Sequence, residues 1–158
     1  MSIWINPPTP EQLNRHHQQT MISTLGIEFT EVGDDSLGAR MPVDARTIQP
    51  FGLLHGGASV ALAETLGSVA ASLTLDLSQK IPVGMEVNAN HVRPVSSGWV
   101  SGVCKPVHLG GSTQVWEIRI CDADGRLVCI SRLTLAVVWR DRTQKPSAPG
   151  DGSSAPPE

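Results

Sequence analysis

One helical segment constrains the fold more than any other feature, because it is long, apolar and almost uncharged. Helical periodicity extends over residues 56–75, and an apolar stripe consists of Leu62, Leu66, Val69 and Leu73. The opposite face lacks the charged residues of a solvated helix and surrounds Glu64 with small side chains: Gly57, Val60, Ala61, Gly67, Ser68 and Ala71. We therefore expect both faces of this helix to be covered.

Strand patterns surround the helix and supply such a cover. Two short ones precede it, at 26–31 and 37–41, and four follow it, at 83–93, 99–108, 113–121 and 127–138. Short turns separate the last four, so the strands should pair antiparallel. A helix capped by Thr9 is expected to extend to about Ser23. The predicted class is α+β, with an antiparallel sheet wrapped around one long central helix.

The bulk composition is that of one compact domain. A chain of 158 residues with 40% hydrophobic content can bury a sizeable core, which we expect to span residues 1–142. Residues 143–158 are rich in proline and glycine and have almost no apolar side chains, so this tail is predicted to be disordered.

Charge and cysteine usage exclude several classes of partner. The net charge of −3 gives no general attraction to nucleic acid or anionic membranes, and no apolar stretch is long enough to span a bilayer. Three cysteines, Cys104, Cys121 and Cys129, show no metal-binding or redox spacing and are predicted to be free thiols. No signal peptide is indicated, so we expect a cytoplasmic protein. We also expect that it needs no metal.

Glu64 is the first candidate for chemistry. It is the only charged acidic or basic residue between Arg46 and Asp76. A solvated surface glutamate is the ordinary alternative, but no other residue on this helix face favours water. Carboxylates in apolar, close-packed surroundings are typical of functional sites, so the sequence favours a functional Glu64.

The start of the helix is the second candidate. His55-Gly56-Gly57 places two glycines where backbone N–H groups have no partner within the helix. Such N–H groups can bind a carbonyl oxygen that becomes negative during acyl transfer. A glycine-rich helix entry can also be purely structural, but Gln49, His55 and Glu64 nearby in the sequence favour the functional hypothesis.

These segments resemble a known enzyme family. The resemblance extends through Met41-Pro42-Val43-Asp44 and residues 49–68, 88–93, 102–106 and 131–134. They are similar to hotdog-fold thioesterases of the phenylacetate-degradation type. Within that type, the similarity is greatest to the branch of 1,4-dihydroxy-2-naphthoyl-CoA and enterobactin-proofreading thioesterases.

The resemblance implies hydrolysis of acyl-CoA, with an aromatic acyl group favoured and aryl carrier proteins as a further substrate class. Glu64 would be nucleophile or general base, and the Gly56 N–H would polarise the thioester carbonyl. Gln49 would position water or the carbonyl, with His55 and Ser68 in support. Substrate contacts would come from His91 at the acyl group, and from Arg93, Gly110, Gly111 and Ser112 at coenzyme A. The family also implies a homodimer, commonly paired into a homotetramer, without a cofactor.

Two alternative functions compete with hydrolysis. A hydratase or dehydratase on the same scaffold uses an Asp and a His, whereas this helix has Glu64 after His55-Gly56-Gly57. A non-catalytic acyl-CoA binding module needs a pocket but no carboxylate.

Helix geometry adds a further expectation. Gly56 and Glu64 lie about 12 Å apart along the axis at 1.5 Å per residue. One chain therefore cannot bring both groups to one carbonyl, and the sequence predicts a dimer with composite sites.

Overall fold

The computed structural model describes residues 1–140, so the predicted disordered tail lies outside the described residues. Its helices and strands follow in the order α1 (Pro10–His16), α2 (Met21–Thr24), β1 (Glu28–Val32), β2 (Leu37–Val43), α3 (Gly56–Leu73), β3 (Lys80–His91), β4 (Gly98–Leu109), β5 (Thr113–Cys121) and β6 (Leu127–Trp139). This order confirms the α+β class and the single long helix. In the described residues, no helix is long and apolar enough to cross a membrane.

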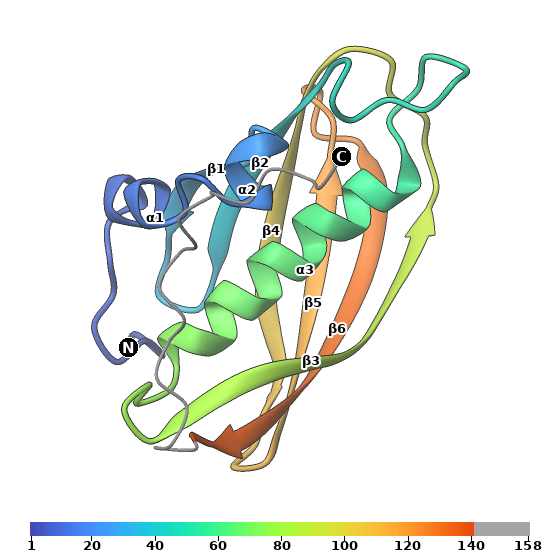
Figure 1. Cartoon of the computed structure of the whole chain (residues 1–158). Coiled ribbons are helices and arrows are strands. Elements are labelled where there is room, and N and C mark those ends of the chain that lie inside the picture. Colours follow the sequence, from blue (N-terminus) through green and yellow to red (C-terminus); the bar gives the residue numbers. More distant parts are fainter. Residues whose placement is uncertain (141–158) are drawn as a thin grey trace, which may run out of the picture.

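The sheet has six antiparallel strands in the order β1-β2-β4-β5-β6-β3. Figure 1 shows α3 lying across one face of this sheet, with β3 beside it. Because β3 follows α3 but pairs with β6, it forms the terminal strand next to the helix. This position brings β3 into contact with Glu64 and with Gly56, at Gly84 and His91 respectively.

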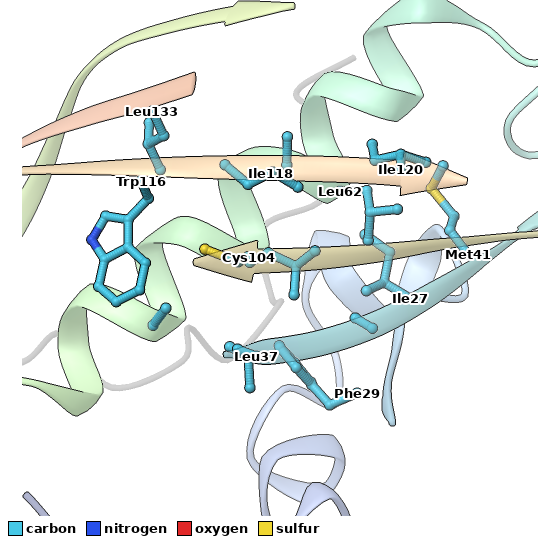
Figure 2. Close-up of a cluster of buried hydrophobic side chains, with 14 of the residues drawn as sticks. Ile27, Phe29, Leu37, Met41, Leu62, Cys104, Trp116, Ile118, Ile120 and Leu133 are labelled. Atoms are coloured by element: carbon cyan, nitrogen blue, oxygen red, sulfur yellow. The ribbon is translucent and has the colours of Figure 1, made fainter. Parts of the chain in front are cut away.

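The core lies between α3 and the sheet. Leu66 of the helix is fully buried, as are Leu62 and the β5 residues Trp116, Ile118 and Ile120, which Figure 2 labels. Burial alternates strictly along β5, because its outward-facing side chains are only partly buried or exposed.

The apolar stripe of α3 differs from the prediction. Val69 and Leu73 are only half-buried, whereas Gly67 and Ala71 of the opposite face are buried. The reason is close packing, since a Cβ atom on Gly67 would lie 2.5 Å from Cδ2 of Leu133. The sheet of the same chain therefore covers part of the small-residue face.

The predicted amino-terminal helix is also wrong in extent. It ends at His16, and α2 begins separately after Thr20, whose Oγ1 accepts a hydrogen bond from the Ile22 N–H at 3.2 Å. Gln19 interrupts the helix with a φ of 60°. The strand predicted from residue 26 begins two residues later, because Gly26 at φ 71° ends α2 and its N–H donates to the Ser23 carbonyl.

Candidate active site

The amino terminus of α3 is capped by its own sequence. His55 is the N-cap, and its Nδ1 accepts a hydrogen bond from the Gly57 N–H at 2.8 Å. The N–H groups of Ala58 and Ser59 donate to the His55 carbonyl. Among residues 1–140, the Gly56 N–H has no hydrogen-bond partner, so it is the N–H of this turn that can donate to a carbonyl oxygen of a ligand.

Gln49 lies in the loop before α3, which is held in place by several backbone hydrogen bonds. The Gln49 N–H donates to the Leu53 carbonyl at 2.8 Å, and the Gly52 N–H donates back to the Gln49 carbonyl at 2.9 Å. The Gln49 side-chain oxygen accepts from the Phe51 N–H. This leaves the side-chain NH₂ of Gln49 as the group that can donate to a ligand.

Four of the predicted site residues line one pocket at this end of the helix. Gln49, Gly56, His91 and Arg93 surround a volume of about 360 Å³, together with Ser59 and apolar side chains. The His91 ring covers the helix start so closely that a Cβ atom on Gly56 would lie 2.8 Å from His91 Nε2. Glycine at this position therefore leaves room for His91 beside the unpaired N–H.

Glu64 lies farther along α3 and contacts the first half of β3, at Gly84. Ser68 Oγ donates a hydrogen bond to Glu64 Oε1 at 3.0 Å, one helical turn away. On its other side, Glu64 Oε1 lies 2.7 Å from the position of a Cβ atom on Gly84. The half-buried carboxylate is therefore held between its own helix and a glycine of the edge strand.

The predicted residues of one chain form separate groups. Gly56 and Glu64 both belong to α3, eight residues apart, so about 12 Å of helix separates them. Gly56 contacts His91 near the end of β3, whereas Glu64 contacts Gly84 near its beginning. No single carbonyl can meet both groups of the same chain at a reactive distance of about 3–3.5 Å.

The residues assigned to coenzyme A are also divided. The Gly110–Ser112 turn lies beside the start of β3, where Lys80 Nζ donates to the Gly111 carbonyl at 3.3 Å. Arg93 follows the other end of that strand. Twelve residues of extended strand measure roughly 36 Å, so the turn and Arg93 of one chain lie far apart.

Gly84 and Lys80 are site neighbours that sequence reasoning did not identify. A glycine inside a predicted strand can indicate close approach of another group, which was an available signal for Gly84. Lys80 lay just outside the predicted strand, and no pattern in the sequence places it beside Gly111.

Other catalytic chemistries have less support in the described chain. Burial raises the pKa of the Cys104 thiol far above its ordinary value, which disfavours a thiolate nucleophile there. Residues 1–140 contain no group of three or more His, Cys, Asp or Glu side chains arranged to hold a metal ion. A carboxylate and an unpaired backbone N–H are the pair of groups suited to attack and stabilisation in acyl transfer.

Comparison with known proteins agrees with this chemistry. The model of the thioesterase superfamily matches residues 51–129. The 1,4-dihydroxy-2-naphthoyl-CoA hydrolase of Escherichia coli is 57% identical over 136 residues, which are 86% of this chain and 99% of that protein. The proofreading thioesterase EntH of Cronobacter turicensis is also 57% identical over 136 residues, covering 86% of this chain and 98% of that relative.

Solved structures give the same result for the fold. A variant of the thioesterase PA1618 from Pseudomonas aeruginosa superposes with a TM-score of 0.86 at 53% identity, covering 88% of this chain and all of that one. Thioesterase HI1161 from Haemophilus influenzae gives a TM-score of 0.84 at 50% identity, with coverage of 87% and 95%. The expected hotdog fold is confirmed, and the chain belongs to the thioesterase superfamily as a thioester hydrolase.

Proposed function

We propose that this hydrolase cleaves coenzyme A thioesters of aromatic acids in composite sites of a two-fold dimer. The observation that carries the proposal is the separation of an unpaired Gly56 N–H from the Glu64 carboxylate within each chain. In the dimer, Gly56 of one protomer binds the carbonyl oxygen, and Glu64 of the other attacks from the opposite side.

The proposed reaction uses few groups because a thioester is already activated. Glu64 either attacks the carbonyl and expels the thiolate, forming an anhydride that water then hydrolyses, or removes a proton from water that attacks the carbonyl directly. In both routes, negative charge develops on the carbonyl oxygen, and the Gly56 N–H and the helix amino terminus stabilise it. Ser68 supports the reaction by holding Glu64 through its hydrogen bond.

The free edge of β3 supports this dimer. In the described sheet, the outer edge of this twelve-residue strand has no partner strand, and Val83 and Met85 on it are exposed. Proteins rarely leave such a long edge uncovered. Antiparallel pairing of two β3 edges, with the two-fold axis near Val87 and Asn88, would bring the Gly84 region of one chain beside His91 of the other. Glu64 and Gly56 contact these two positions.

The same pairing explains the divided coenzyme A residues. It brings the Gly110–Ser112 turn of one protomer to the end of the dimer where Arg93 of the other lies. Both elements can then bind the same ligand. Half-exposed Trp99 and Val103 on β4 give the dimer a further apolar surface, which supports the proposed pairing into a tetramer.

The name of a relative and the state of the cysteines support the proposed substrate and compartment. A relative at 57% identity carries the name of a naphthoyl-CoA hydrolase, which favours a fused aromatic acid. Aryl carrier proteins are the second proposed substrate class, because their pantetheine arm presents the same thioester. All three cysteines are free thiols, as expected of a protein in the reducing cytoplasm.

Glu64→Gln tests the proposed chemistry, because it preserves size and removes the anion. We expect the turnover of benzoyl-CoA or dihydroxynaphthoyl-CoA, measured as the release of free thiol, to fall at least about a hundredfold. Binding of a non-hydrolysable thioester analogue should persist. Near-normal turnover in a folded variant would remove Glu64 from the mechanism, and a screen with phenylacetyl and fatty acyl thioesters would identify the acyl group.

A further inference from the structure

Two cations and an exposed indole gather where β3 begins and β6 ends. Lys80 and Trp139 are paired residues of these strands, and Lys80 Nζ lies 4.8 Å from the centre of the Trp139 ring. Arg140 is the next residue of the chain. We call Lys80, Trp139 and Arg140 the corner cluster.

The corner cluster is held in place by backbone groups. The Arg140 N–H donates to the Gln79 carbonyl at 2.8 Å, and Arg140 Nη1 donates to the Leu77 carbonyl at 2.9 Å. Lys80 reaches the Gly111 carbonyl at 3.3 Å. These hydrogen bonds use only some of the N–H donors of Lys80 and Arg140, and their partners are uncharged carbonyl groups. The positive charges therefore remain available to an anion.

Charge and exposure point to a ligand that is both anionic and flat. Among residues 1–140, neither Lys80 nor Arg140 forms an ion pair, whereas Arg40, Arg46 and Arg126 all do. Trp139 is 71% exposed, and its indole can stack on an aromatic base. Phosphates beside a purine would satisfy all three side chains.

The distance from the corner cluster to Glu64 matches one particular ligand. Glu64 contacts Gly84, and four residues of β3 separate Gly84 from Lys80, about 13 Å at 3.3 Å per residue. The pantetheine arm has about thirteen bonds between its sulfur and the first phosphate. By the dimensions of an extended peptide chain, that arm spans about 15 Å.

We propose that the corner cluster binds the nucleotide end of coenzyme A while the thioester lies at Glu64. Trp139 stacks on the adenine, and Lys80 and Arg140 bind the phosphates of the nucleotide. This inference rests on the proposed function, because it takes Glu64 as the point from which the arm extends. It adds Lys80, Trp139 and Arg140 to the coenzyme A site, for which the family resemblance implied Arg93 and the 110–112 turn.

Binding of adenosine 3′,5′-bisphosphate to the full chain tests the proposal without any catalysis. We expect calorimetry to show binding that weakens at least about tenfold in Trp139→Ala and in Lys80→Gln, and that weakens with added salt. Lys105→Gln is the matched control, because Lys105 is an exposed lysine of β4 that pairs with Asp35 away from this corner. Its affinity should equal that of the unmodified protein.

Kinetics separate this inference from the proposed function. In Trp139→Ala and Lys80→Gln, KM for an acyl-CoA should rise at least about tenfold at constant kcat. KM for the same acid on N-acetylcysteamine, which lacks the nucleotide, should not change. Unchanged nucleotide affinity, or equal effects on both thioesters, overturns the corner cluster even if hydrolysis proceeds. Cluster-dependent nucleotide binding in a protein whose Glu64→Gln variant keeps full turnover upholds the cluster and overturns the proposed mechanism.

Discussion

Gly84→Ala should damage catalysis while leaving the fold intact. The added methyl group would lie 2.7 Å from Glu64 Oε1, whereas ordinary contacts begin at about 3.4 Å. Because the strand and the helix backbone are packed, the carboxylate is the group that can move, by about 0.7 Å. Misplacement of a catalytic group by about 1 Å can reduce the rate a hundredfold, so we expect kcat to fall about ten- to a hundredfold.

Steady-state hydrolysis measures the expected loss of kcat in Gly84→Ala, and thermal melting measures whether the fold stays intact. The melting temperature should change little, because the contact is with the end of a flexible side chain. In a Glu64→Gln background, Gly84→Ala should have almost no further effect on kcat, since residues acting as one unit are not additive. A kcat within about threefold of normal in the single variant would refute the reasoning that Gly84 positions Glu64.

Three further predictions concern the remaining contacts. Gly67→Val places a side chain against buried Leu133, so overpacking should lower the free energy of unfolding by about 1–3 kcal/mol in urea titrations, and an unchanged midpoint would contradict the packing. Arg93→Ala should raise KM for coenzyme A thioesters but not for N-acetylcysteamine thioesters, and equal effects would leave Arg93 a structural role. Burial and the neighbouring His16 lower the pKa of His17. Stability should therefore be complete above the ordinary histidine pKa of about 6.5 and decline as the pH falls below it, and His17→Gln should flatten that decline in thermal melts.

Much of the fold could be predicted because its patterns are local. The periodicity of α3 and the alternation in β5 follow from which side chains one element buries, and turn residues separate the strands. The break at Gln19 could not be predicted, because a non-glycine residue at positive φ leaves no sequence signal. Val69 and Leu73 belong to the apolar stripe but are only half-buried, because periodicity gives the direction of a side chain but not how fully its neighbours cover it.

The site was predictable in its residue types more than in its assembly. Glu64 and Gly56 stand out because a lone carboxylate and a glycine pair are unusual on an apolar helix. Contacts between elements depend on strand order, which the sequence does not encode locally, so Gly84 and Lys80 went unnoticed. For the same reason, Arg93 and the 110–112 turn were grouped together although they lie at opposite ends of β3.

The shared site is tested most directly by mixing two inactive variants. Glu64→Ala removes the carboxylate. Gly56→Pro removes the N–H at the first helical position, where the helix backbone tolerates proline, and its ring displaces the neighbouring His91 of the same damaged site. After subunit exchange, each mixed dimer should contain one intact site and one site with both defects. For equal amounts of the two variants, random pairing predicts recovery of about a quarter of normal activity per chain. Mixed dimers verified by mass spectrometry that remain inactive, or a monomer that is active, would contradict the account.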